Sequence, residues 1–248
     1  MSQLLHTKGL RKSFGAVKAA DDVSITITAN ELVSLIGTNG SGKTTFSNMV
    51  TGYLKPDAGS IEFLGKDISK LSPREVTRQG IARSFQIPQV FLQLSVLDNM
   101  LVAIACSHGE LSFTRSSHRA EAIDSATRLL ERFALQAYCD RKVVEMPGGM
   151  RKLLDIAMAL TATPKLLLLD EPTSGVSVDE KFPMMDTVSA ALETEGVSVL
   201  FVEHDMEIVQ RYSKRVIAFY SGRVIADASP ADVLDDEQVQ LYVTGRRK

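Results

Sequence analysis

Apolar positions along the chain follow two patterns, and each predicts a different kind of strand. Val23, Ile25 and Ile27 alternate with polar residues, which is the period of a strand with one buried face. Residues 165–171 and 197–204 instead contain consecutive apolar positions, which indicates strands buried on both faces in a parallel sheet covered by helices. The sequence therefore predicts an α/β fold with a mostly parallel sheet and, in its first third, an antiparallel β element.

Turn and capping residues place further elements. Asn30 tolerates left-handed φ, so we expect it to turn the chain into the next strand. Residues 60–64 form another predicted strand. Residues 72–75, Ser-Pro-Arg-Glu, carry the signals of a helix start: a capping serine, a proline at the first position and a glutamate that completes a capping box. Gly80 is expected to end that helix before a strand at residues 81–86.

The middle of the chain is predicted to be mainly helical, from residue 95 to about residue 160. Two interruptions are expected, at residues 107–117 and at residues 145–149. We interpret residues 87–160 as a helical subdomain inserted between strands of the core. The length of 248 residues allows one large domain or two small ones, and we expect residues 1–248 to form a single domain.

The most informative segment lies between a predicted strand and a predicted helix. It fits the phosphate-loop pattern Gly-x-x-x-x-Gly-Lys-[Ser/Thr] and consists of Gly37, Thr38, Asn39, Gly40, Ser41, Gly42, Lys43, Thr44 and Thr45. The glycines let the backbone approach an anion closely, and N–H groups at the helix N-terminus then point at phosphates. Lys43 is expected to reach the β- and γ-phosphates, and Thr44 to offer its hydroxyl to Mg²⁺. The segment predicts a nucleotide-binding site.

Polar side chains follow both of the predicted buried strands. Asp170 and Glu171 end one of them, and His204 ends the other. Ligands of open α/β sheets bind at the carboxyl ends of the strands, so we expect these three side chains near the phosphates. A pair of helix-capping carboxylates and a structural histidine are the alternative interpretations.

Composition narrows the classes of function. The formal net charge is −2, and no basic run stands out except Arg246-Arg247-Lys248, so a nucleic-acid-binding surface is not expected. Cys106 and Cys139 form no Cys-x-x-Cys pair, which suits a reducing cytoplasm without a disulfide framework. We see no secretory signal and no apolar run near the roughly 20 residues that span a bilayer. We expect a protein that is soluble or is held at a membrane by other subunits.

Taken in order, these motifs resemble the ATP-binding subunits of ABC transporters over nearly the whole chain. Residues 37–45 resemble the Walker A loop, residues 166–170 the Walker B strand and residues 174–177 the D-loop. Residues 146–150, Met-Pro-Gly-Gly-Met, stand where the family has its signature, typically Leu-Ser-Gly-Gly-Gln. The resemblance implies a P-loop NTPase fold with a RecA-like core, and hydrolysis of ATP with Mg²⁺, coupled to transmembrane transport.

The resemblance also implies roles for single residues. Glu171 would polarise the attacking water, and Asp170 would hold Mg²⁺ through water. Gln86 would contact Mg²⁺ and the attacking water, and His204 would bind the γ-phosphate. Phe14 stands where the family stacks an aromatic ring on adenine. Considered without the family, Gln86 is interpreted as a surface glutamine and Phe14 as a core aromatic of the β element.

The sequence departs from the family pattern at the signature and in the D-loop. Pro147 and Met150 replace the signature serine and glutamine, while Gly148 and Gly149 remain, and Ser177 stands where aspartate is frequent. In this family each ATP lies between the Walker A loop of one chain and the signature of its partner. Pro147 has neither a hydroxyl nor a backbone N–H, so one composite site is expected to be weakened. We therefore expect a heterodimer with a paralogous ATPase.

Within the family, several segments resemble the branched-chain, or hydrophobic, amino-acid importers: residues 81–86, 96–99, 152–157 and 241–243. This resemblance implies two membrane permease subunits, a periplasmic binding protein that acts indirectly, no nucleic-acid partner, and a peripheral position at the cytoplasmic face of the inner membrane. The ATPase of lipopolysaccharide export is an alternative. A non-transport ABC ATPase acting on ribosomes or DNA is another, against which the low basic charge and the single ATPase domain argue.

Overall fold

The computed structural model describes residues 3–108 and 116–245, so the C-terminal basic residues and most of the predicted break at 107–117 lie outside it. Its central sheet has six strands in the order β10-β9-β3-β8-β7-β6. These strands are β3 (Leu32–Gly37), β6 (Ile81–Ser84), β7 (Leu166–Asp170), β8 (Ser198–Val202), β9 (Arg215–Tyr220) and β10 (Arg223–Ala228). All neighbours pair in parallel except β9 and β10, so the prediction of a mostly parallel sheet is confirmed.

Strand β7 contains consecutive apolar residues because both of its faces are buried. Leu167 and Leu169 pack into one hydrophobic cluster, whereas Leu166 and Leu168 pack into a second cluster on the other side of the sheet. All four side chains are fully buried. The sheet therefore has a core on each face, as the apolar run predicts.

A second, antiparallel sheet has the strand order β2-β1-β4-β5. Its strands are β1 (Gln3–Phe14), β2 (Val17–Thr28), β4 (Ala58–Phe63) and β5 (Lys66–Asp67). Val23, Ile25 and Ile27 of β2 are buried in the second cluster, which confirms the alternating pattern. Asn30 has a left-handed φ of 61°, and the chain turns there into β3 as expected.

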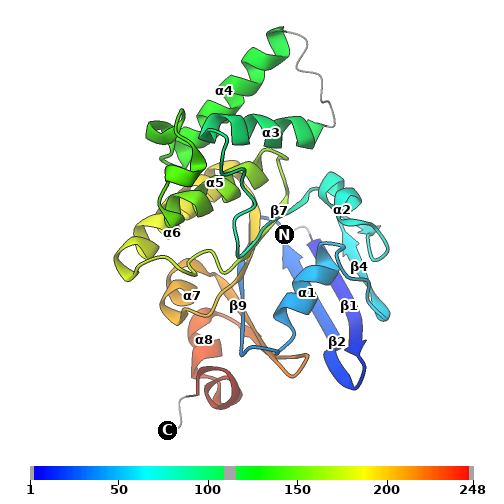
Figure 1. The fold of residues 1–248 in the computed structure, drawn as a ribbon. Helices are drawn as coiled ribbons and strands as arrows, with labels where there is room; N and C mark the ends of the chain where they lie inside the picture. The colour runs from blue at the N-terminus through cyan, green and yellow to red at the C-terminus, as the bar shows by residue number, and fades with distance from the viewer. Residues whose placement is uncertain (1–2, 109–115, 246–248) are drawn as a thin grey trace.

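Helices pack around the two sheets (Figure 1). They are α1 (Lys43–Val50), α2 (Pro73–Gln79), α3 (Val96–His108), α4 (Ser116–Arg132), α5 (Gly148–Leu160), α6 (Val178–Glu195), α7 (Met206–Tyr212), α8 (Pro230–Asp235) and α9 (Glu237–Val239), with short turns η1 (Gln136–Tyr138), η2 (Val143–Glu145) and η3 (Gln240–Thr244). In Figure 1, α3 and α4 lie together at one end of the molecule, and α5 lies between them and the sheet. None of the helices in the described ranges is long and apolar enough to cross a membrane.

Two boundaries illustrate local causes. Glu75 accepts hydrogen bonds from the Ser72 N–H (2.7 Å) and hydroxyl (2.6 Å), and Gly80 ends the helix with φ 107°, as predicted. The strand predicted at 81–86 was too long, because β6 ends at Ser84. Beyond Ser84, the chain leaves the sheet and is held instead by the Asp155 carboxylate of α5.

Candidate functional site

The predicted phosphate loop connects β3 to α1, and its backbone is too crowded for side chains at two positions. A Cβ at Gly42, where φ is 114°, would lie 2.4 Å from the Ala19 carbonyl oxygen. A Cβ at Gly37 would lie 2.5 Å from the Phe219 carbonyl oxygen. Both glycines are therefore required by close packing of the loop against β2 and β9.

Lys43 is the charged group of this loop. Its amine donates to the carbonyl oxygens of Gly37 (2.7 Å) and Thr38 (3.0 Å). Burial lowers the pKa of Lys43, and the nearby Glu171 charge acts in the opposite direction. The Phe46 N–H makes an intrahelical bond to the Gly42 carbonyl (2.9 Å), so the N–H groups just ahead of it lie at the open, positive end of α1. The loop thus offers an anion both a cation and backbone donors.

A cleft of about 420 Å³ opens above the loop. It is lined by Phe14, Val17, Ala19, Asn39, Gly40, Ser41, Gly42, Lys43, Thr44, Thr45, Glu171, Val202 and His204. Phe14 is 52% exposed, so it is not the core aromatic of the alternative interpretation. The cleft brings together an aromatic ring, the phosphate loop and two polar strand ends. These groups suit, respectively, the base, the phosphates and the terminal phosphate of a nucleoside triphosphate.

Glu171 gathers two of the other predicted residues. Its Oε2 accepts from the Gln86 amide (2.7 Å), and its Oε1 lies 2.9 Å from His204 Nε2. Gln86 therefore touches the carboxylate although it is not in the lining of the cleft. Glu171 has a left-handed φ of 46°, and its N–H donates to the Val202 carbonyl (2.8 Å). This unusual backbone turns the carboxylate from the end of β7 towards His204 at the end of β8.

Asp170 lies beside the cleft and outside its lining. Its Oδ2 accepts from the guanidinium of Arg83, at 2.8 Å from Nε and also from Nη2. Arg83 stands on β6 and is almost fully buried. Sequence reasoning missed this residue, although a charged side chain in the apolar strand Ile-Ala-Arg-Ser was the signal that could have found it.

Helix α5 supplies two further contacts that the sequence did not indicate. The Lys152 amine donates to the Glu171 carbonyl (3.0 Å). The buried Asp155 carboxylate accepts from the Ser84 hydroxyl (2.5 Å) and from the Gln89 N–H (2.8 Å). Burial raises the pKa of Asp155, and these hydrogen bonds act against that rise. The helix therefore holds both ends of the segment that carries Gln86.

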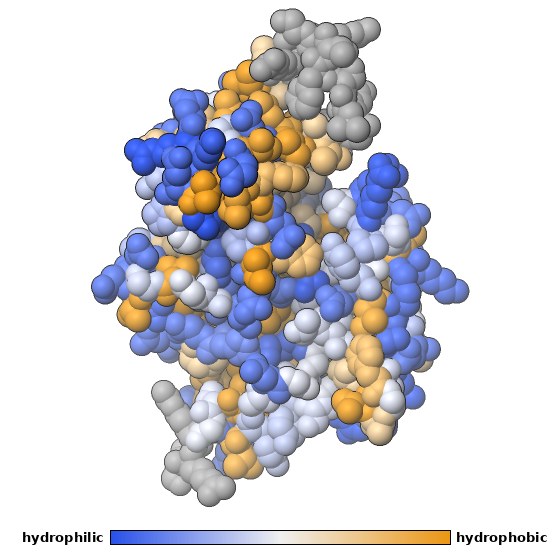
Figure 2. All heavy atoms as spheres, viewed as in Figure 1, coloured by the Kyte–Doolittle hydropathy of each residue, from blue (hydrophilic) through white to orange (hydrophobic). Residues whose placement is uncertain are grey.

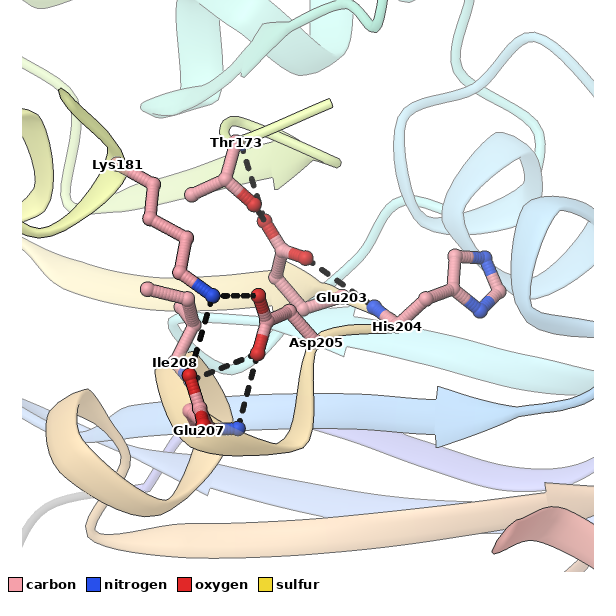
Figure 3. A network of polar contacts seen from close by, with 7 residues as sticks. All are labelled: Thr173, Lys181, Glu203, His204, Asp205, Glu207 and Ile208. Atoms are coloured by element: carbon pink, nitrogen blue, oxygen red, sulfur yellow. Dashed lines mark hydrogen bonds and ion pairs between the residues drawn. The ribbon is translucent and has the colours of Figure 1, made fainter. Parts of the chain in front are cut away.

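Glu203 and Asp205 fix the loop around His204 (Figure 3). Glu203 is 3% exposed and accepts from the Thr173 hydroxyl (2.8 Å) and from the His204 N–H (3.1 Å). Asp205 caps α7 and accepts from the Lys181 amine (2.6 Å). In Figure 3 the imidazole of His204 points away from this network. The buried Glu203 carboxylate thus anchors the backbone of His204, whose ring contacts Glu171 instead.

The predicted signature residues are apart from this cleft. Pro147 is the N-cap of α5, and Gly148, Gly149 and Met150 form its first turn. None of the four lines the cleft above the phosphate loop. A Cβ at Gly148 would have no heavy atom within 4 Å, so this helix end is open on one side. A single chain does not bring the two halves of the predicted site together.

The oxygen atoms at the cleft suit a hard cation better than a transition metal. Thr44, Asp170 and Gln86 offer a hydroxyl, a carboxylate and an amide oxygen, the ligand types that Mg²⁺ uses. Among residues 3–108 and 116–245, no group of three or more His, Cys, Asp and Glu side chains could hold a metal on its own. The donor set fits Mg²⁺ that arrives with phosphates and binds few protein atoms.

Comparisons with known proteins agree with this geometry. The family model described as ABC transporter matches residues 20–174. The chain is 38% identical to a probable branched-chain amino acid transport ATP-binding protein, LivG, of Archaeoglobus fulgidus, over 97% of this chain and 95% of that protein. It is 32% identical to the high-affinity branched-chain amino acid transport ATP-binding protein LivG of Escherichia coli strain K12, over 96% of this chain and 97% of that protein.

A solved structure agrees as well. An ATP-binding cassette of an ABC transporter in its ADP conformation matches with a TM-score of 0.83 and 34% identity, over 96% of this chain and 97% of that one. The resemblance inferred from the motifs is thereby confirmed. The chain belongs to the ABC transporter family and is one of its ATP-binding cassettes, which bind and hydrolyse ATP.

Proposed function

We propose that this chain hydrolyses Mg²⁺–ATP to power the import of branched-chain amino acids through a membrane transporter. One observation carries the choice of solute. The relatives named for branched-chain amino acid transport match the chain from end to end at 32–38% identity, in Archaea and in Bacteria. The solute itself would be selected by permease subunits and by a periplasmic binding protein that acts indirectly.

The cleft supports the following division of work. Phe14 stacks on the adenine, and Lys43 with the backbone N–H groups of residues 37–45 binds the phosphates. Thr44, Asp170 and Gln86 would hold Mg²⁺, which would neutralise negative charge on the phosphates. Glu171 orients and polarises the attacking water. His204, whose Nε2 lies 2.9 Å from the Glu171 carboxylate, would donate a hydrogen bond to the γ-phosphate.

We propose that residues 87–160, the helical subdomain, dock on the membrane subunits. Exposed apolar side chains support this assignment: Ile87, Phe91, Leu92, Leu94 and Val144. Ile87 is 75% exposed and lies one residue after Gln86. Figure 2 shows hydrophobic side chains gathered at the end of the molecule where α3 and α4 lie. A surface of this kind favours a protein partner, which supports the proposal that the chain is held at the cytoplasmic face of the membrane by its permease subunits.

The second ATPase subunit is proposed to be a paralogue. Restoring the hydroxyl by Pro147→Ser is expected to raise ATP turnover of the chain studied alone by about ten- to a hundredfold, because a hydrogen bond to a charged group contributes about 1.5–3 kcal/mol. Turnover of the heterodimer should change less, since its other site uses the partner's signature. The measurement is phosphate release by the two assemblies. Equal turnover of the chain alone and of the pair, unchanged by Pro147→Ser, would contradict the heterodimer.

Reconstitution tests the proposed function directly. The chain is co-purified with the paralogous ATPase and the two permeases, placed in vesicles, and given the periplasmic binding protein with leucine. We expect ATP-dependent leucine accumulation that stops when this chain is omitted. Hydrolysis stimulated by lipopolysaccharide, or by ribosomes, with no amino-acid transport would instead support another member of the family.

A further inference from the structure

Arg83 joins the two elements that carry the proposed magnesium donors. Its Nε and Nη2 both donate to Oδ2 of Asp170, at the end of β7. Its third nitrogen, Nη1, donates to the side chain of Asn48 on α1 (2.7 Å) and to that of Thr51, the C-cap residue of α1 (3.3 Å). One buried guanidinium therefore spans the strand that ends in Asp170 and the helix that follows the phosphate loop.

The residues that Arg83 contacts at α1 are in line with Thr44 of the phosphate loop. Thr44 and Asn48 are four residues apart, so they lie on one face of α1, and Thr51 follows three residues later as its C-cap. Arg83 binds the two C-terminal members of this row, and Thr44 is the third. The planar guanidinium of Arg83 thus links the helix that carries Thr44 to the strand that ends in Asp170.

The way in which the guanidinium meets Asp170 leaves one oxygen available. Both donors converge on Oδ2, and no donor within residues 3–108 and 116–245 contacts Oδ1. A cation that needed both oxygens would be excluded, whereas a magnesium-bound water needs only one. Arg83 also packs on the Phe85 ring, 4.9 Å from Cζ to the centroid, next to Gln86. The Arg83 guanidinium is therefore held by Asp170, by the α1 side chains and by the Phe85 ring.

From this arrangement we propose that Arg83 is a positioning residue for the metal: it orients Asp170 so that Oδ1 faces the Mg²⁺ of bound ATP. The inference rests on the proposed role of Asp170 and adds a residue that touches neither metal nor nucleotide. Partners that orient metal ligands typically change metal affinity by about 10–100-fold when they are removed. A charge-removing substitution of Arg83 should therefore weaken the metal while sparing the nucleotide.

The experiment measures ATP affinity in excess Mg²⁺ and in EDTA. The ratio of the two affinities is the gain in ATP affinity that the metal provides, called the gain below. For Arg83→Gln we expect this gain to fall about tenfold or more, with affinity in EDTA within about twofold of wild type. Arg74→Gln, at an exposed arginine of α2, is the matched control and should keep the full gain. Binding of Mn²⁺ to the ATP complex, followed by electron paramagnetic resonance, gives a readout independent of hydrolysis.

Further variants separate positioning from folding. Arg83→Lys keeps the charge but offers a single point of contact, so we expect an intermediate loss of the gain and a stable fold. In an Asp170→Asn background, Arg83→Gln should cause no further loss of the Mg²⁺-dependent gain in ATP affinity, because both changes act on the same side chain. The proposal is overturned if Arg83→Lys and every folded Arg83→Gln sample keep the full gain, or if affinity falls equally with and without metal. A wild-type chain that gains nothing from Mg²⁺ would refute the proposed metal site itself.

Discussion

Glu171→Gln is expected to slow ATP hydrolysis in the assembled transporter by about 10²–10⁴-fold, the range that general-base catalysis contributes. The amide keeps the size of the side chain but cannot polarise the attacking water as a carboxylate does. Affinity for ATP should change little, because Glu171 is proposed to bind the water and not the phosphates. Single-turnover hydrolysis and equilibrium binding of ATP measure the two effects separately.

A matched control uses another glutamate of the same chain. Glu193 is exposed on α6 and lies outside the cleft lining, so Glu193→Gln should hydrolyse ATP at the wild-type rate. A Glu171→Gln transporter with near-normal turnover would refute the catalytic assignment. Loss of ATP binding in the same variant would mean that Glu171 holds the loop together, for example through its contacts with Gln86 and His204.

Lys43→Ala should abolish tight ATP binding, with a loss of about 10–100-fold in affinity or more. The reason is that the phosphates lose a charged donor, and such a bond contributes about 1.5–3 kcal/mol. The same change removes the amine that bonds the Gly37 and Thr38 carbonyls, so the loop itself should become less ordered. Isothermal titration with ATP measures the affinity.

Lys8→Ala is the control for Lys43→Ala. Lys8 is an exposed lysine of β1 and lies outside the cleft lining, so its removal should leave ATP affinity unchanged. Thermal unfolding of both variants in the absence of nucleotide shows whether the fold survives. Tight ATP binding by a folded Lys43→Ala protein would contradict the assignment of the loop.

Much of the fold could be predicted, because the local sequence patterns agree with the burial and hydrogen bonds that the tertiary structure provides. The leucines of β7 are apolar at every position, and the structure buries them on both faces of a sheet. The capping box at Ser72 works within four residues, so the sequence alone contains all its partners. The end of β6 was misplaced because Asp155, 71 residues from Ser84, decides it. Long-range side-chain bonds of this kind leave no local pattern.

The same distinction holds for the site. The loop around Lys43 is contiguous and could be found from one motif, and Glu171 with His204 followed from the ends of buried strands. Arg83 could not be assigned, because its partners lie 35 and 87 residues away, at Asn48 and Asp170. The signature residues lie outside the cleft lining, as expected if the proposed composite site takes its signature from a second chain.

A structure of the Glu171→Gln chain with ATP and Mg²⁺ tests the central claim most directly, because slow hydrolysis should keep the triphosphate intact. The account predicts adenine on Phe14, the γ-phosphate beside the Lys43 amine, and Mg²⁺ between Thr44 and the Oδ1 side of Asp170. Triphosphate bound elsewhere, for example in the groove lined by Arg74, Arg78 and Lys165, or a metal remote from Asp170, would contradict it.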